Sequence, residues 1–269
     1  MSETVLAFDI ETIPDIELGA RLYGLETLEV PQQFEALLQK RRQDASGSEF
    51  MPIHLHRVIV IGMVHKTSEG LRCLSLGSDI ATERERIERF FSGLERWVPR
   101  LVSWNGTQFD LPVLNYRSLR YGICAPRYWE TGERHPDFRY NNYLSRYHWR
   151  HTDLMDVLGG YQSGRNAVRL AEAAQLVGLP GKMGFSGDQV LEQYLAGARE
   201  RIDRYCETDA LNTYLLFLRL EKMRGRLSAE AFRSASDEVE SWLGSQADPY
   251  WRDFRVHWDL ARWHAEEGS

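Results

Sequence analysis

The amino-acid sequence predicts an α/β protein, because strand-like apolar runs occupy its N-terminal part and a helical pattern follows residue 150. The composition agrees with this class: of 269 residues, 43% are hydrophobic and 27% are charged. Such values are typical of globular chains and exclude disordered and fibrous proteins. A chain of this length can bury a sizeable core without disulfides.

Four segments have the pattern of strands. Residues 5–9 and 57–64 are short apolar or β-branched runs, as in buried strands. Residues 71–76 alternate apolar and polar side chains, and residues 101–104 form a further apolar run that stops at an Asn-Gly pair. We therefore expect a sheet of at least four strands.

The helical pattern begins between the last two of these strands, where residues 80–97 repeat apolar side chains at helical spacing on a charged background. Further helices are expected over 166–177, 187–198 and 199–224. Strands followed by helices in this order complete the α/β prediction.

Net charge, the N-terminal residues and the cysteines indicate the class of protein and its location. With 33 Lys and Arg against 39 Asp and Glu, the formal charge is −6. The first twenty residues lack a basic start and a long apolar core, and no window approaches the ~20 apolar residues that span a bilayer. We expect a cytoplasmic protein without membrane association. Its cysteines, Cys73, Cys124 and Cys206, fit neither a disulfide framework nor a zinc site and are expected to be reduced.

Two segments depart from the packed pattern. Residues 31–56 contain a short helix-like piece followed by a polar Ser/Gly stretch, and we expect a mobile insertion there. Residues 226–269 form a charged amphipathic helix and then a segment rich in Trp and Arg, which we expect to be a helical C-terminal extension. Its aromatic side chains either pack on the domain or bind a protein partner.

Asp9 and Glu11 end the first predicted strand. Because side chains of a strand alternate between its faces, both carboxylates lie on the same face. Two such groups near a buried strand end either share a proton or hold a cation. The alternative is a solvated strand end that happens to carry two acids.

Two further acids, Asp110 and Asp209, lie at positions where they could bind a cation. Asp110 lies in the first turn of a helix that follows the Asn-Gly break, where an acid is also favoured by the helix dipole alone. Tyr205 and Asp209 are four residues apart in the longest helix and therefore share one face, beside an apolar stripe. A buried Asp needs a partner, and a divalent ion shared with Asp9 and Glu11 would supply one.

In combination, these elements resemble the motifs of the DEDD superfamily of 3′-to-5′ exonucleases, which has a ribonuclease H-like fold. Residues 8–12 (FDIET) are similar to its first motif, 105–110 (NGTQFD) to its second and 205–210 (YCETDA) to its third. The tyrosine indicates the tyrosine subclass. More closely, the chain resembles stand-alone bacterial proteins related to the exonuclease domain of family B DNA polymerases, over residues 1–225.

The resemblance implies an α/β domain with a central mixed β-sheet flanked by helices, and a two-metal phosphodiesterase. The family carboxylates fall on Asp9, Glu11, Asp110 and Asp209, which would hold two Mg²⁺ or Mn²⁺ ions, while Tyr205 would orient the attacking water or the scissile phosphate. The implied activity is 3′-5′ hydrolysis of single-stranded nucleic acid, with DNA favoured over RNA as the source of the 3′ ends.

The resemblance also implies residues that bind the substrate. Thr12 and Ile13, which follow the first motif, would grip the terminal nucleotide, and Asn105 of the second motif would contact the substrate or orient a metal ligand.

Independently of the family, residues 116–151 interleave arginines with aromatic residues, and the local charge is positive. Guanidinium groups can neutralise phosphates while aromatic rings stack on bases, as in proteins that hold single strands without reading sequence. Arg139, Tyr140 and Arg146 are our candidates for this role. The alternative is a loop whose rings are buried and whose arginines pair with acids.

Two rival functions remain open at this point. Residues 9–12 (DIET) loosely resemble the DxDxT signature of haloacid dehalogenase-like phosphatases, with Glu in place of the second Asp. A non-catalytic nucleic-acid-binding module on the same fold is the other rival. Retention of all four carboxylates and the tyrosine speaks against it, because clustered acids without a metal repel one another.

Overall fold

A computed structural model describes residues 4–44, 49–162, 164, 167–181 and 183–258. Its centre is a five-stranded sheet in the order β3-β2-β1-β4-β5. β1 pairs antiparallel with β2, and β2 with β3, whereas β4 and β5 run parallel to β1. The strands are β1 (Val5–Pro14), β2 (His56–Thr67), β3 (Gly70–Leu76), β4 (Arg100–Ser103) and β5 (His151–Asp153). This mixed sheet with flanking helices confirms the predicted α/β, ribonuclease H-like fold.

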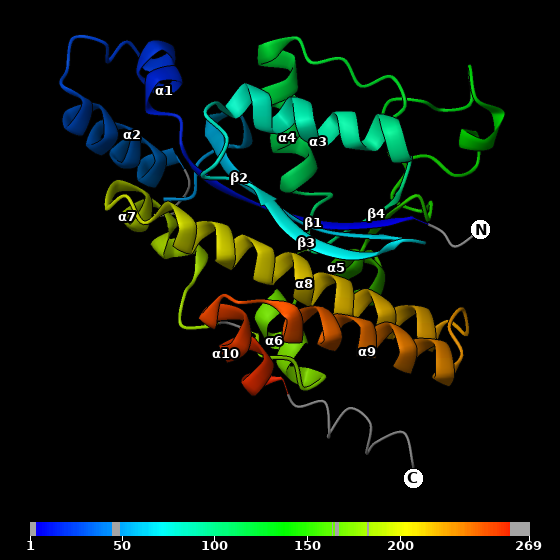
Figure 1. The fold of residues 1–269 in the computed structure, drawn as a ribbon. Coiled ribbons are helices and arrows are strands. Elements are labelled where there is room, and N and C mark those ends of the chain that lie inside the picture. The colour runs from blue at the N-terminus through cyan, green and yellow to red at the C-terminus, as the bar shows by residue number, and fades with distance from the viewer. Residues whose placement is uncertain (1–3, 45–48, 163, 165–166, 182, 259–269) are drawn as a thin grey trace.

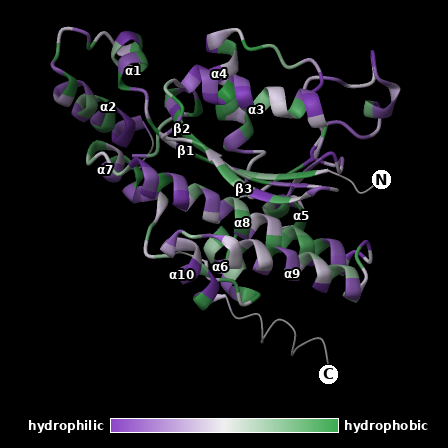
Figure 2. Cartoon of the chain, viewed as in Figure 1, coloured by the Kyte–Doolittle hydropathy of each residue, from purple (hydrophilic) through white to green (hydrophobic). Residues whose placement is uncertain are grey.

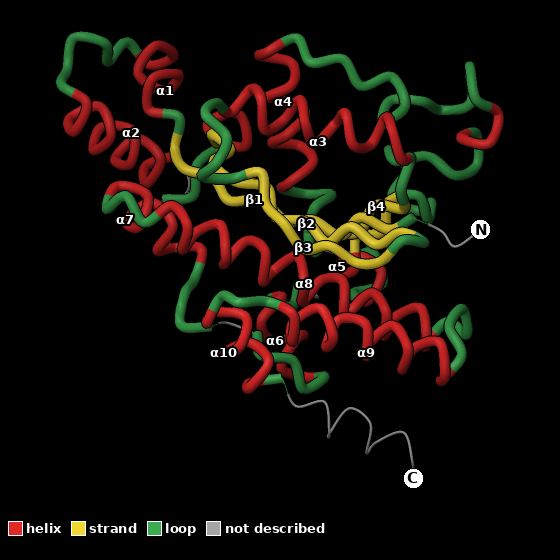
Figure 3. Tube along the Cα trace, viewed as in Figure 1, coloured by secondary structure: helices red, strands yellow, loops and turns green. Residues whose placement is uncertain are grey.

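The helices form two layers around the sheet (Figures 1 and 3). α3 and α4 cover one face, and α8 crosses the other face, backed by α6, α9 and α10. The α-helices are α1 (Ile16–Tyr23), α2 (Val30–Asp44), α3 (Glu83–Trp97), α4 (Asp110–Tyr121), α5 (Leu154–Leu158), α6 (Leu170–Leu176), α7 (Val190–Leu195), α8 (Arg199–Met223), α9 (Ala229–Ser245) and α10 (Pro249–His257). The described residues also include the short 3-10 helices η1 (Ile53–Leu55), η2 (Pro136–Phe138) and η3 (Gly187–Gln189).

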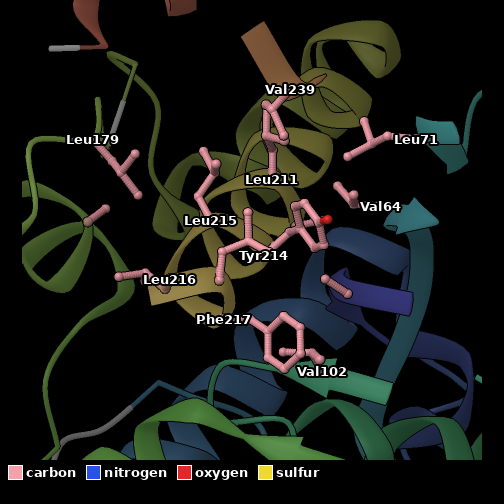
Figure 4. Packing of buried hydrophobic residues seen from close by; sticks show 14 of the residues in the cluster. Val64, Leu71, Val102, Leu179, Leu211, Tyr214, Leu215, Leu216, Phe217 and Val239 are labelled. Carbon is pink, nitrogen blue, oxygen red and sulfur yellow. The ribbon is translucent and has the colours of Figure 1, made fainter. Parts of the chain in front are cut away.

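Alternation along β1 divides the core in two. Leu6, Phe8 and Ile10 are buried with residues of α3 and α4, whereas Val5 and Ala7 are buried with residues of α8. Figure 4 shows part of the second cluster, in which residues of α8 pack between the sheet and α9. The odd-numbered side of β1 therefore faces α8.

Helix α8 is buried around most of its circumference because it lies between the sheet and the helices of the C-terminal half. In Figure 2, hydrophobic residues gather where α6, α8 and α9 meet. This surrounding layer fixes α8 in place, and every side chain that α8 presents to β1 is positioned with it.

Residues 31–56 are more structured than the sequence indicates. Helix α2 occupies residues 30–44, and its Leu37 packs with Met51 and Leu55 and against residues of α1. Residues 45–48 of the polar stretch lie outside the described residues. The sequence pattern therefore predicts the helix, whereas mobility of this insertion stays a prediction.

The C-terminal extension contributes α9 and α10 to the main core. Trp251, Phe254 and Trp258 are buried in the same cluster as the apolar residues of α8. Of the two roles considered for these aromatic residues, packing on the domain is the one that the structure shows. Residues 259–269 lie outside the described part, and a partner for the tail stays a prediction. None of the described helices combines the length and apolar character needed to cross a membrane.

Candidate active site

Four acidic side chains and one tyrosine, separated by up to 200 residues in the sequence, line one cleft of about 580 Å³. Asp9 and Glu11 come from β1, Asp110 is the first residue of α4, and Tyr205 and Asp209 lie one turn apart on α8. Asp9 and Glu11 continue the odd-numbered side of β1, which explains why they face α8. The structure thus brings together all five residues that the sequence motifs indicate.

The distance between α8 and the sheet depends on Gly62 of β2, which pairs with Asp9 of β1. A Cβ atom at position 62 would collide with the main-chain carbonyl of Cys206 and would lie 2.8 Å from the amide nitrogen of Glu207. The absence of a side chain lets α8 approach β2 closely. This close approach brings the helix within reach of the carboxylates of β1.

Asp110, the first residue of α4, is also held by β1. The main-chain N–H of Ile10 donates to Asp110 Oδ1 at 3.1 Å, and the Asp110 side chain is buried. The loop before α4 is shaped by Asp153, which accepts the N–H groups of Asn105 and Thr107, both at 2.9 Å. Asp110 therefore contacts β1 in addition to occupying the first turn of α4, and both contacts fix its position.

The cluster is electrostatically unfavourable without a cation. Burial, followed by the charges of Asp110, Glu11 and Asp209, raises the pKa of Asp9 well above its ordinary value. Burial and the charges of Asp209 and Asp110 do the same for the pKa of Glu11. Burial also raises the pKa of Asp110 to about 7. Such a group of acids either binds protons or gathers a positive ion.

Tyr205 sits at the edge of this cluster, with its ring against Phe185 at a centroid distance of 4.6 Å. Burial and the carboxylates of Asp209, Glu11 and Asp9 raise the pKa of the Tyr205 phenol far above its ordinary value. The hydroxyl is therefore protonated at neutral pH. It can donate a hydrogen bond but cannot act as a free base.

Cys206 is a neighbour of the site that motif spacing did not single out. Its Sγ donates to the main-chain oxygen of Asp9 at 3.3 Å and accepts from Gly62 N–H at 3.1 Å. Sγ also lies within 4.8 Å of carboxylate oxygens of Asp9 and Glu11. Because burial and these carboxylates raise the thiol pKa, Cys206 is protonated and supports Asp9 rather than acting as a thiolate ligand.

The donor set fits a hard divalent cation. Asp9, Glu11, Asp110 and Asp209 offer carboxylate oxygens, which are the ligands that Mg²⁺ and Mn²⁺ prefer, and a cation would compensate the charge that burial leaves unfavourable. The protonated thiol of Cys206 adds nothing that such a cation needs.

Of the three residues beside the motifs that are expected to bind substrate, Asn105 lines the cleft, whereas Thr12 and Ile13 do not. Asn105 lines the cleft, and its positive φ of 65° turns the chain between β4 and α4. Thr12 Oγ1 is hydrogen-bonded to His56 Nδ1 at 2.8 Å, and Ile13 is buried in a cluster with residues of α8. Thr12 and Ile13 therefore follow the acidic residues on β1 without lining the cleft, and their contact with a nucleotide stays a prediction.

The basic and aromatic segment does not reach the cleft. Arg139 and Tyr140 are exposed elsewhere, and Arg146 forms an ion pair with Asp156 at 2.9 Å. Arg117 of the same segment is buried, where it pairs with Asp15 and Glu83. The structure therefore does not bring Arg139, Tyr140 or Arg146 to the four carboxylates. For several arginines of this segment, the alternative of pairing with acids is the one observed.

Other residues line the cleft that sequence patterns did not indicate. Trp104 directly precedes the second motif and Phe109 lies within it, Met155 belongs to α5, and Ala167 to Leu170 lead into α6. The sequence could have indicated Trp104 and Phe109, because each is adjacent in the chain to a motif residue that lines the cleft. Met155 and residues 167–170 are brought in only by tertiary packing.

A comparison with protein-family models also indicates an exonuclease. A family model described as "predicted 3′-5′ exonuclease related to the exonuclease domain of PolB" matches residues 48–258. The chain belongs to this family. The matched range includes Asp110, Tyr205 and Asp209, whereas Asp9 and Glu11 precede it. No match was found among curated proteins.

Membership in this exonuclease family supports a nuclease acting on nucleic acid and favours it over the phosphatase alternative. The family match also extends through α10, further than the motif resemblance of residues 1–225. The aromatic residues of α10 that pack against α8 thus lie within the stretch that the family shares.

Proposed function

We propose that this protein is a metal-dependent 3′-5′ exonuclease that removes nucleotides from the 3′ end of single-stranded nucleic acid, with DNA the favoured substrate. The observation that carries the proposal is the convergence of Asp9, Glu11, Asp110, Asp209 and Tyr205 on one cleft in a protein of the exonuclease family. In the overall reaction, water adds to the terminal phosphorus and the bond to the preceding 3′-oxygen breaks. A nucleoside 5′-monophosphate leaves, and a new 3′-hydroxyl remains on the strand.

The carboxylates would hold two Mg²⁺ or Mn²⁺ ions, one between Asp9, Glu11 and Asp209 and the other between Asp9 and Asp110. Bound there, the ions would lower the pKa of the attacking water and stabilise the charge on the departing oxygen. The pKa values of Asp9, Glu11 and Asp110 are raised, and burial is the largest cause in each case. These raised values support a need for positive charge among the four carboxylates.

The remaining residues of the cleft would position the strand. Because the Tyr205 phenol is protonated, its hydroxyl can donate to the scissile phosphate or hold the attacking water in line. Asn105 lies at the same cleft, where its side-chain amide would contact the substrate or orient a metal ligand.

The primary test is degradation of a 5′-labelled single-stranded DNA oligonucleotide and its RNA equivalent, with Mg²⁺, with Mn²⁺ and with chelator. We expect a metal-dependent ladder that shortens from the 3′ end, and the ratio of the DNA rate to the RNA rate identifies the preferred substrate. Intact oligonucleotides under every condition, from protein shown to be folded, would favour the non-catalytic binding module instead.

Asp209→Asn tests the site assignment directly. The substitution removes one carboxylate charge and keeps the side-chain shape, so turnover should fall by at least 10²-fold, as when a major electrostatic contribution to the transition state is lost. Affinity for the strand, measured by fluorescence anisotropy, should remain close to that of the wild type. Asp237→Asn, an exposed acid on α9, serves as the matched control. Undiminished turnover in Asp209→Asn contradicts the assignment.

A further inference from the structure

A positively charged side chain lines the cleft together with the four carboxylates. Among the described residues around the cleft, Arg169 is the only lysine or arginine, and it stands just before the first residue of α6. The Arg169 side chain is exposed, and no ion pair joins its guanidinium group to a carboxylate of the described residues. A cation that lies near so many acids and pairs with none of them is available to a ligand.

The main chain around Arg169 is held on both sides. Trp104 Nε1 donates to the carbonyl oxygen of Val168 at 3.0 Å, and the Arg169 N–H donates to Glu172 Oε2 at 3.0 Å. Trp104 directly precedes Asn105, so the segment that carries Arg169 is tied to the loop that leads to Asp110. Ala173 and Ala174 of α6 are buried in the main core, which fixes the other end.

Arginine is suited to a phosphate at such a place. A guanidinium group offers paired donors in a planar arrangement that matches two phosphate oxygens. The acids of the cleft are expected to be engaged with metal ions, so their charge is compensated without Arg169. The apolar neighbours Trp104 and Phe109 add rings that a base can contact.

We propose that Arg169 binds a backbone phosphate of the nucleic-acid strand at the active-site cleft, where it contributes affinity rather than chemistry. The inference rests on the proposed function for the class of substrate. It assigns to Arg169 the phosphate contact that the sequence pattern had placed on Arg139 and Arg146, neither of which reaches the cleft.

The test compares Arg169→Ala and Arg169→Lys with Arg233→Ala, an exposed arginine on α9 that serves as a control. Binding of a labelled single-stranded oligonucleotide is measured by anisotropy in the Asp209→Asn background, across a series of salt concentrations. Arg169→Ala should weaken binding about tenfold, as expected for the loss of one charge-assisted contact. The slope of log affinity against log salt should become shallower by about 0.7.

The effect should be the same for oligonucleotides of different base sequence, because a phosphate contact does not read bases. Arg169→Lys should recover part of the affinity and the full salt slope. In the otherwise wild-type enzyme, Arg169→Ala should raise KM by a similar factor, with kcat changed less than KM.

Unchanged affinity and salt slope in Arg169→Ala, in protein with the wild-type melting temperature, would overturn the inference. A loss of kcat at constant KM would also overturn it, since it would place Arg169 in the chemical step. These results are distinguishable from failure of the proposed function, in which wild-type protein neither binds nor degrades the oligonucleotide.

Discussion

At position 62, a hydrogen atom is the only side chain that the contact between α8 and the sheet allows. Gly62 lies opposite Asp9 on the neighbouring strand and against the main chain of Cys206 and Glu207. The same contact sets the distance between β1, which carries Asp9 and Glu11, and α8, which carries Tyr205 and Asp209. A single residue thus links strand packing with the geometry of the carboxylates.

Gly62→Ala should therefore impair both stability and activity. One added methyl group must displace main chain rather than a flexible side chain, at a cost of about 1–3 kcal/mol in the free energy of unfolding. Activity should fall further than the loss of stability explains, because α8 moves relative to β1. Urea denaturation and turnover of a single-stranded oligonucleotide measure the two effects.

Gly187→Ala is the matched control for this substitution, since nothing lies within 4 Å of a Cβ at position 187. If Gly62→Ala retained wild-type turnover, the close approach of α8 would not matter for the site.

At the scale of elements, the three-residue strand β5 shapes both the loop before α4 and the start of α5. Asp153 ends this strand, accepts the Asp156 N–H at the start of α5 at 3.3 Å and accepts the N–H groups of Asn105 and Thr107. Asp153 is the N-cap of α5, and an Asp directly before a helix is a feature that a sequence pattern can indicate. The sequence pattern does not show that the same carboxylate shapes the loop before Asp110.

Asp153→Ala should destabilise the protein by about 2–4 kcal/mol, because several main-chain N–H groups lose their acceptor and two of them are in the loop of the second motif. Since Asp110 follows this loop, turnover should fall as well, even at temperatures where the variant is fully folded. Thermal unfolding and oligonucleotide turnover, with Asp237→Ala as the control, measure the outcome. A destabilised variant with normal turnover would show that Asp153 supports the fold alone.

At the scale of the whole molecule, the acidic cluster couples stability to pH and to metal. Burial and mutual repulsion raise the pKa values of Asp9 and Glu11, and burial raises that of Asp110 to about 7. In chelator, the folded state therefore holds protons that the unfolded state has already released. Stability contributed by these groups falls as the pH rises from about 4 towards 7.

Stabilisation by Mg²⁺ or Mn²⁺ should consequently grow with pH across this window, because the ions replace protons that would otherwise be held. The measurement is the melting temperature with metal minus that with chelator, at a series of pH values. The difference is the appropriate quantity, because burial lowers the pKa of His151 to about 4 and makes its own contribution rise with pH.

Asp9→Asn supplies the control for this experiment. In chelator the variant should be more stable than the wild type at neutral pH, since folding no longer requires a buried carboxyl group at position 9 to take up a proton. Its metal-dependent increment should be small. An increment that is independent of pH in the wild type would contradict the assignment of these carboxylates to a metal site.

By itself, the sequence determined what depends on local spacing. Four strands and the long helix follow from apolar periodicity. The alternation of side chains places Asp9 and Glu11 on one side of β1, and a spacing of four puts Tyr205 and Asp209 on one side of α8. These features are predictable because they depend on the geometry of a single element.

Only the tertiary structure decided which of several arginines lies at the cleft. Arg117 and Arg146 pair with buried acids, whereas Arg169, which no motif indicates, lines the cleft. Strand β5 is too short to show a period, and its partner β4 lies about 50 residues earlier in the chain. The pairing of these arginines and of β4 with β5 depends on contacts between segments that are distant in the chain. The sequence pattern of either segment alone does not predict those contacts.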